Sequence, residues 1–229
     1  MVAQLLLGHS RFKSEYFPAE EELFARLAGG VHEPLAMVIS CCDARVVPDV
    51  IVNSQPGDLF GLRNIAALVP KFGAGHHRAV GAAIEYAIHG LKIEHMVVCG
   101  HTHCGGLRAL AQGPVKLAAH MPSLAEWLGD AEQVLAHIRP MLAGVDDEEL
   151  IDHLAYESVP LQLENLLSYP AVTWALSRGR LQLHGWVYDL SSGGLHGYVP
   201  EDNAFVPLDS AGRRSIVMPE PRLRELKRE

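Results

Sequence analysis

Two short segments of this chain combine thiol, imidazole and carboxylate groups at spacings that suit metal chemistry. The first, Cys-Cys-Asp-Ala-Arg, spans residues 41–45, and the second, Gly-His-Thr-His-Cys-Gly-Gly, spans residues 100–106. Two thiolates and one imidazole, from Cys41, His101 and Cys104, form a donor set typical of a zinc site that keeps its fourth position open. The sequence therefore predicts a zinc centre built from two distant segments.

Neighbouring residues compete for the same roles. Cys42 follows Cys41 in an extended run, so its side chain points to the opposite face, and we expect a buried apolar thiol there. Cys99 falls inside an apolar run and is expected to pack in the core. His103 is an alternative to His101 as the ligand, but only one of these two histidines can easily face the metal.

Both segments follow apolar runs that predict buried strands. Residues 35–40 and 95–100 are nearly continuous apolar runs, which suit strands covered on both faces of a parallel sheet. Another strand is predicted at 58–63 after the turn signal Gln-Pro-Gly, and a helix at 75–90 from its apolar stripe. Strand, helix and strand at these lengths form a βαβ unit. Since ligands bind beyond the carboxyl ends of such strands, the two segments are expected to meet there.

The rest of the chain is predicted to complete one α/β domain. Further helices are predicted at 19–28, from Gly105 onward, at 123–142 and at 146–167. Pro160 is expected to break or kink the last of these. Alternating apolar and polar residues predict a half-exposed strand at 180–188, and the turn Ser-Ser-Gly-Gly predicts a short hairpin through 195–198.

Composition limits the class of protein. The 229 residues are 48% hydrophobic and 20% charged, which is globular usage. With 19 basic and 27 acidic residues the net charge is −8, which argues against a nucleic-acid partner. No apolar run approaches the roughly 18–20 residues that span a bilayer, no secretory signal is visible, and four cysteines do not make a disulfide framework. We therefore expect a cytoplasmic protein that binds neither nucleic acid nor membrane.

Together the motifs resemble the β-class carbonic anhydrases. The family pattern is a Cys-x-Asp-x-Arg segment, a Pro-Gly-Asp-x-Phe-x-x-Arg-Asn segment and a His-x-x-Cys-Gly-Gly segment, which match residues 41–45, 56–64 and 101–106. Further matches lie at 82–87, 164–166 and 184–189, so the resemblance covers about residues 20–200. It implies a zinc enzyme that catalyses the reversible hydration of CO2 to bicarbonate and a proton.

The resemblance assigns roles residue by residue. It implies that Cys41, His101 and Cys104 hold one Zn2+ per chain, and that zinc-bound hydroxide attacks CO2. It also implies that Asp43 orients this hydroxide and that Arg45 fixes the Asp43 carboxylate through a fork-shaped contact. The resting state can be open, or closed with Asp43 on the zinc, and the sequence does not decide between them.

Other matched positions belong to the substrate pocket. Phe60, Ile65 and Tyr86 match residues that shape an apolar CO2 pocket, usually across a subunit boundary. The Gly105 amide is expected to donate a hydrogen bond to a substrate oxygen. His32 stands where plant-like members carry a substrate-binding Gln, so it is expected to donate a hydrogen bond or carry protons, with an ordinary surface His as the alternative.

The resemblance also implies an architecture. It consists of a mostly parallel sheet of about four strands, with the 180–188 strand at an edge, flanked by helices. We expect a single domain over residues 1–229, with an N-terminal helical arm at 1–30 and a C-terminal tail at 205–229. The arm commonly reaches across a partner subunit in this family, so the expected partner is a second copy, in a homodimer or a dimer of dimers.

One regulatory feature of the family is expected to be absent. Some bacterial members bind inhibitory bicarbonate in a second pocket that needs a Trp three residues before the first ligand Cys. Val38 stands at that position here, although Arg63 and Tyr188 match other members of the pocket.

Three alternatives stay open. Hydrolysis of carbonyl sulfide or carbon disulfide uses the same attack on a linear carbon, and pocket shape would decide between the substrates. A catalytically silent zinc-binding scaffold is the second, and the presence of Asp43 and Arg45 argues against it. A nucleotide-binding Rossmann protein is the weakest, because residues 100–106 lack the Gly-x-Gly-x-x-Gly spacing.

Overall fold

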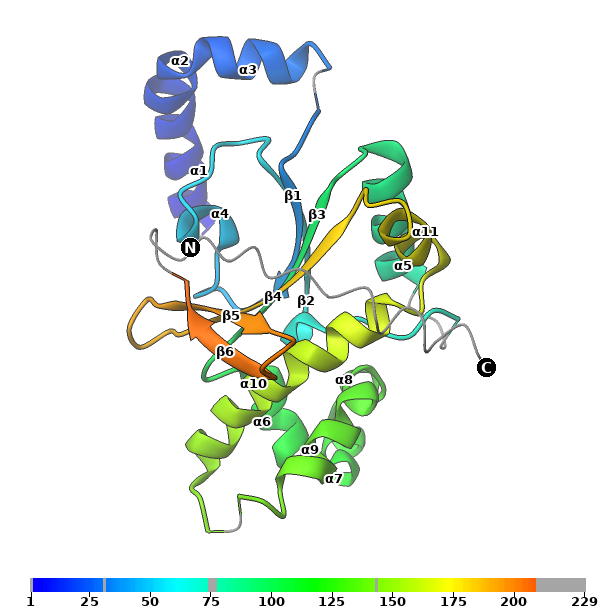
Figure 1. Cartoon of the computed structure of the whole chain (residues 1–229). Coiled ribbons are helices and arrows are strands. Elements are labelled where there is room, and N and C mark those ends of the chain that lie inside the picture. The colour runs from blue at the N-terminus through cyan, green and yellow to red at the C-terminus, as the bar shows by residue number, and fades with distance from the viewer. Residues whose placement is uncertain (1, 31, 74–77, 143, 209–229) are drawn as a thin grey trace. The chain divides into compact units, whose positions relative to one another are not determined.

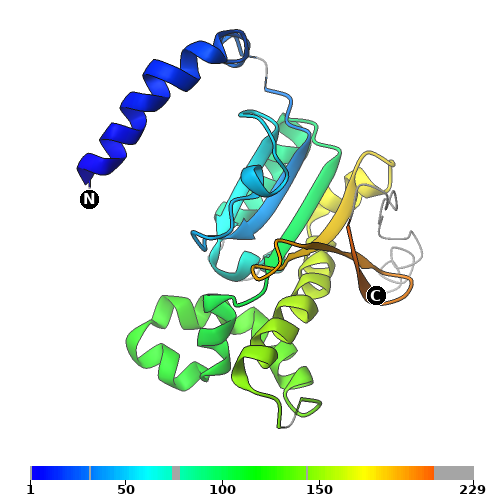
Figure 2. The same cartoon turned by 90° about the vertical axis from the view of Figure 1, so that its left-hand side faces the viewer.

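The computed structural model describes residues 2–30, 32–73, 78–142 and 144–208 (Figures 1 and 2). Contacts divide the chain into a helical unit, Met1–Glu33, and a larger unit, Pro34–Glu229. Within the described ranges, no helix is both long and apolar enough to cross a membrane. The larger unit carries the predicted α/β architecture.

The N-terminal unit is held together by its own aromatic side chains. Its elements are α1 (Val2–Arg11), the π-helix η1 (Phe12–Tyr16), α2 (Phe17–Ala19) and α3 (Glu21–Ala28). The rings of Phe17 and Phe24 stack with their centroids 4.6 Å apart. The helix predicted at 19–28 is present as α3, which ends at Ala28 and has Gly29 as its C-cap. Helix α1 buries none of its residues, so the leucines at 5–7 form an exposed apolar surface.

Among the described residues, a six-stranded mixed sheet forms the centre of the larger unit (Figure 1). Its strands are β1 (Ala36–Cys41), β2 (Leu59–Asn64), β3 (His95–His101), β4 (Gln182–Tyr188), β5 (Leu195–Val199) and β6 (Ala204–Pro207). Their order is β2-β1-β3-β4-β5-β6; the first four strands are parallel, and β5 and β6 add antiparallel. The predicted fold class, a mostly parallel sheet flanked by helices, is confirmed.

Strand β4 differs from the prediction in its place. The resemblance implies an edge position for the strand at 180–188, but β5 and β6 pair outside it. Buried residues, among them Leu183 and Val187, alternate along β4 with partly exposed ones. One face of the strand is therefore more fully covered than the other. The predicted hairpin is present as β4 and β5. Strand β6 occupies the beginning of the predicted tail, and residues 209–229 lie outside the described residues.

Helices of the larger unit pack against the sheet and form its main core. The larger unit contains α4 (Pro48–Ile51), η2 (Ile65–Ala67), α5 (Arg78–Glu85), η3 (Tyr86–Gly90), α6 (Gly105–Ala111), α7 (Pro114–His120), α8 (Pro122–Leu128), η4 (Gly129–Ala131), α9 (Glu132–Ile138), α10 (Asp147–Leu166) and α11 (Pro170–Leu176). Helices α5, α10 and α11 pack on one face to form the main core, which includes Ile39, Val98 and Leu163. The close approach of α10 requires glycine at Gly185, because a Cβ there would lie 2.7 Å from Val159 Cγ1.

A group of helices lies beyond the carboxyl ends of the parallel strands (Figures 1 and 2), and a second core forms there. Helices α6, α8 and α9 and the first half of α10 bury aliphatic side chains there, together with Cys41 and Cys104. Helix α10 continues through Pro160, so of the predicted break or kink the break is absent, and the kink stays a prediction. Proline removes one backbone N–H, and the buried Leu154 and Leu163 on either side hold the helix in place. This second core thus includes one cysteine from each chemical segment.

Candidate metal centre

The carboxyl ends of β1 and β3 bring the two segments together. Ser40 of β1 pairs with Cys99 of β3, so Cys41 and His101 end neighbouring parallel strands. Cys104 follows as the residue before α6. The sulfur and nitrogen ligand atoms of the three residues all lie within 4.8 Å of one another, and all three residues are buried. The fold thus assembles the predicted donor set.

The His101 ring is oriented to present one nitrogen to a cation. Its Nδ1 lies 2.8 Å from the carbonyl oxygen of Thr102, and because a carbonyl only accepts, Nδ1 carries the proton. Nε2 then has a free lone pair, and it is buried without a hydrogen-bond partner among the described residues. Leaving a buried polar group unsatisfied costs about 1–3 kcal/mol. A cation at Nε2 would remove this cost.

The thiols of Cys41 and Cys104 form a hydrogen bond with each other. The Cys104 thiol donates a hydrogen bond to Cys41, which lowers the pKa of Cys41 to about 4 although burial opposes the shift. The same contact, together with burial, raises the pKa of Cys104. The backbone N–H groups of Asp43 and Ala66 also donate to Cys41 Sγ, at 3.4 Å each. Two thiolates here need a cation in place of the proton of this hydrogen bond, and the Cys2His set fits zinc.

Asp43 and Arg45 form a two-point ion pair beside these donors. Arg45 Nε donates to Asp43 Oδ1 at 2.9 Å, and Nη2 donates to Oδ2 at 2.7 Å. These bonds hold the pKa of Asp43 well below its usual range, so the group remains a carboxylate near neutral pH. Among the described residues the close donor group does not include Asp43. Its carboxylate is bound to the guanidinium of Arg45.

Arg63 fixes the loop that carries these groups. Its Nε donates to the carbonyl of Cys41 at 3.1 Å, and its Nη2 donates to those of Asp43 and Val46 at 2.8 and 2.7 Å. Three carbonyls of one loop therefore converge on a guanidinium from β2. The resemblance connects Arg63 with a second bicarbonate pocket, whereas the structure gives it this loop-binding role; the absence of bicarbonate regulation stays a prediction.

The two glycines at the start of α6 have different surroundings, and only Gly106 lies close to η2. A Cβ at Gly106 would lie 2.6 Å from Ile65 Cγ2 and 3.2 Å from Ala66 Cβ, so a side chain does not fit there. A Cβ at Gly105 would meet nothing within 4 Å, so space is open beside this residue. Trp127 Nε1 donates to the Ile65 carbonyl at 2.8 Å, a contact that no sequence motif indicates.

The residues expected to line the substrate pocket leave apolar surface exposed in the single chain. Phe60 and Tyr86 are in ring contact, with centroids 5.9 Å apart. Tyr86 is 54% exposed, and Ile65, which lies beside Gly106, is 38% exposed. His32 belongs to the N-terminal unit, and its role at the substrate stays a prediction.

The other cysteines and His103 have different surroundings. Cys42 is exposed, so the prediction of a buried thiol is wrong: β1 ends one residue earlier, and the strand alternation no longer applies. Cys99 is buried as predicted, and burial raises its pKa to about 12. His103 Nε2 lies 3.1 Å from Ser191 Oγ, and within the described residues only His101 of the two histidines joins the donor group.

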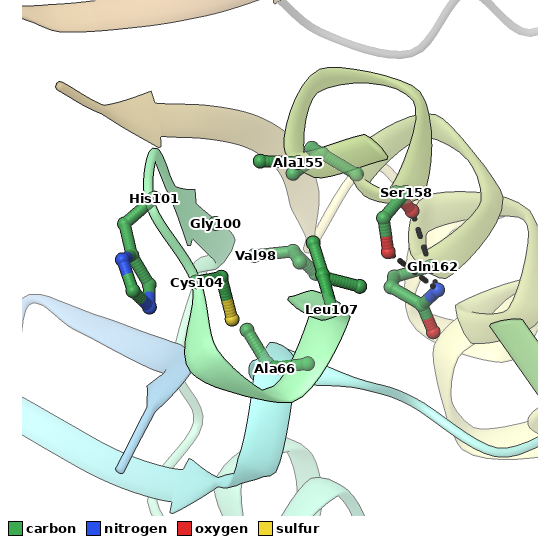
Figure 3. A pocket seen from close by; sticks show the side chains of 11 residues that line it. Ala66, Val98, Gly100, His101, Cys104, Leu107, Ala155, Ser158 and Gln162 are labelled. Carbon is green, nitrogen blue, oxygen red and sulfur yellow. Dashed lines mark hydrogen bonds between the residues drawn. The ribbon is translucent and has the colours of Figure 1, made fainter. Parts of the chain in front are cut away.

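A narrow pocket lies behind the donors, where β3, α6 and α10 meet (Figure 3). His101 and Cys104 contribute to its lining, and Ser158 and Gln162 of α10 face it from the other side. The Gln162 amide donates to the carbonyl and hydroxyl oxygens of Ser158, and its Oε1 accepts from the N–H of Val69 at 2.8 Å. Helix α10 therefore backs the donor loops with polar groups that are already satisfied.

Known proteins resemble this chain over most of its length. The family model described as carbonic anhydrase matches residues 36–195. A carbonic anhydrase of Synechococcus elongatus is 40% identical over 190 residues, which cover 83% of this chain and 69% of the relative. The structure of the β-carbonic anhydrase CcaA superposes with a TM-score of 0.88 at 35% identity, covering 96% of each chain. A chain from the structures of two tetrameric β-carbonic anhydrases of Sordaria macrospora gives a TM-score of 0.76 at 29% identity, over 86% of this chain and 95% of that one.

Proposed function

The chain belongs to the β class of the carbonic anhydrase family, and from this premise we propose that it catalyses the reversible hydration of CO2 to bicarbonate and a proton. The proposal is supported above all by the buried donors Cys41, His101 and Cys104, which lie next to the Asp43–Arg45 pair. These donors would hold one Zn2+ per chain. When bound, Zn2+ acts as a Lewis acid that makes water nucleophilic near neutral pH.

The chain's own polar groups would orient the reactants. Asp43, an acceptor-only carboxylate, would accept a hydrogen bond from the nucleophile and so direct its lone pair at the carbon of CO2. Arg45 holds this carboxylate with parallel N–H···O bonds, which fix its position and keep it charged. Arg63 keeps the backbone of the same loop in place.

The proposed substrate pocket is apolar, as a molecule without a dipole requires. We assign its walls to Phe60, Ile65 and Tyr86, with the Gly105 amide donating to a substrate oxygen. The open space beside Gly105 supports this assignment. His32 is proposed as a further hydrogen-bond donor or proton carrier.

A homodimer or a dimer of dimers is the proposed active form. The exposed Ile65, Tyr86 and leucines of α1 offer apolar surface to a second copy, and the similar Sordaria macrospora proteins are tetrameric. The proposed organisation is one catalytic domain with an arm at 1–30 and a tail at 205–229. All four cysteines are free thiols, which supports a cytoplasmic location.

Replacing Arg45 by alanine is expected to reduce hydration far more than zinc content. The guanidinium contacts the Asp43 carboxylate and the His103 carbonyl, so its loss frees the carboxylate to rotate. We expect kcat/KM to fall about 10- to 100-fold, as for other residues that orient a metal site, with zinc still near one per chain. Stopped-flow hydration with an indicator dye and metal analysis of the same samples measure the two quantities.

Two results would contradict these assignments in different ways. Equal loss of zinc and of hydration in Arg45→Ala would give Arg45 a structural role only. Wild-type protein that holds zinc without hydrating CO2 would instead favour carbonyl sulfide or carbon disulfide as substrate, or a silent scaffold.

Hydration is expected to become faster between about pH 6 and pH 9. Two thiolates cancel the formal charge of Zn2+, so this donor set acidifies water less than three neutral imidazoles would. Asp43 does not cause the rise: its pKa is lowered, so it is charged throughout this window and would lose its charge only in strong acid. Rates of zinc-loaded protein at constant ionic strength test the prediction, and a flat profile would contradict it.

A further inference from the structure

Asp152 contacts the turn between two of the metal donors from a distant element. It lies in the second turn of α10, and its Oδ1 accepts the backbone N–H of His103 at 2.6 Å. His103 stands between His101 and Cys104 in the chain. The contact joins residues 49 positions apart, so no local motif marks Asp152.

The backbone of His103 needs such support. Its φ is +54°, in the left-handed region that a residue with a Cβ rarely adopts. Its N–H donates to Asp152, its carbonyl accepts from Arg45 Nη2 at 3.1 Å, and its ring Nε2 lies 3.1 Å from Ser191 Oγ. Both flanking peptide groups and the side chain are therefore held, which is the condition under which a strained conformation persists.

The same contacts connect α10 with the Asp43 carboxylate. Arg45 Nη2 donates both to the His103 carbonyl and to Asp43 Oδ2, the latter at 2.7 Å. Movement of the His103 turn would therefore displace one of the acceptors that position the guanidinium. It would also displace Cys104, the next residue and a metal donor.

Glu148, the carboxylate that neighbours Asp152, has a different partner. Glu148 forms a two-point pair with Arg108, in which Nη2 donates to Oε2 at 2.6 Å. Glu148 Oε2 lies 3.5 Å from His103 Nδ1, and Asp152 Oδ1 lies 3.6 Å from the same nitrogen. Among the described residues, Asp152 is the carboxylate that bonds to the backbone of the turn.

We propose that Asp152 is a positioning residue for the metal centre. It keeps His103 in the left-handed conformation that sets His101, Cys104 and Arg45 in their relative places, and it acts through these residues rather than on substrate. The proposal rests on the zinc-dependent function proposed above. Its first effects are therefore expected on metal affinity and on the geometry of the donors.

Asp152→Ala is expected to weaken zinc binding about 10-fold, within the range found for residues that orient metal ligands. The Zn2+ Kd is measured by competition with a chelator, and donor geometry by the visible spectrum of the Co2+-substituted protein, which should change. At saturating zinc, kcat/KM should fall by a similar factor. Asp152→Asn keeps an oxygen acceptor and should remain within about threefold of wild type. Glu157→Ala removes an exposed acidic residue of the same helix and is the matched control.

A glycine at position 103 separates positioning from general stabilisation. Glycine adopts positive φ without strain, so Asp152→Ala should change the Zn2+ Kd less than about threefold in a His103→Gly background. If Asp152→Ala alone does not fold, the double variant should recover a folded protein that binds zinc. Equal effects in both backgrounds, failure of this recovery, or Asp152→Ala matching Glu157→Ala in Kd and cobalt spectrum would each overturn the proposal. Because Kd and spectrum are read without CO2, absence of hydration in the wild type would overturn the proposed function separately.

Discussion

Replacing Asp43 by alanine is expected to remove most CO2 hydration and to leave zinc in place. A preorganised group at a reacting centre contributes about 100-fold or more to the rate, which corresponds to about 2.7 kcal/mol. Zinc should stay because the donors are Cys41, His101 and Cys104, and the Asp43 backbone N–H that donates to Cys41 Sγ is unchanged by the substitution. Stopped-flow hydration on metal-analysed protein measures both effects.

Two further variants make this result specific. Asp43→Asn keeps the size of the side chain and one acceptor oxygen but loses the charge that pairs with Arg45, so its rate should fall between wild type and Asp43→Ala. Asp49→Ala removes an exposed carboxylate of α4 and should hydrate CO2 at the wild-type rate. An Asp43→Ala protein that retains more than about a tenth of wild-type kcat/KM would contradict the orienting role.

The elements that frame the site were predictable because their signals are local. The apolar runs at 35–40 and 95–100 and the turn signal before residue 58 need only contiguous residues, and β1, β2 and β3 follow them closely. The order of strands is not a local property. The edge position predicted for 180–188 is wrong because β5 and β6 return along β4. Of the break or kink predicted at Pro160, the break is absent, because buried contacts on both sides outweigh one missing hydrogen bond.

The donors were predictable from their types and spacing, whereas the residues that hold them were not. Arg63 and Asp152 come from β2 and α10 and bond to backbone atoms, which any residue type would present. The exposure of Cys42 shows how a single position at a strand end changes the outcome: β1 ends at Cys41, so Cys42 lies outside the strand and the alternation that predicts its burial does not apply. Such features depend on where elements end and meet in space, and sequence spacing does not record either.

Replacing Cys41 by serine is expected to abolish zinc binding and hydration together. Cys41 supplies one of the two sulfur donors, and a neutral hydroxyl cannot replace a thiolate as a zinc ligand. The loss of zinc affinity should exceed the roughly 10- to 100-fold effect of residues that only orient ligands. Cys42→Ser is a matched control one residue away, because Cys42 is exposed and lies outside the donor group; its zinc content and rate should equal wild type.

Thermal unfolding distinguishes loss of the metal from loss of the fold. Zinc at 1,000 times its Kd stabilises the folded state by about 4 kcal/mol, which is about 8–16 °C in Tm for a chain of this size. A chelator should therefore lower the Tm of wild type and Cys42→Ser by such an amount and leave that of Cys41→Ser unchanged. If the chelator lowered all three equally, zinc would bind without Cys41. If it lowered none of them while wild type lost its zinc, the metal would contribute no stability, and the orphaned Nε2 of His101 would need another partner in the folded protein.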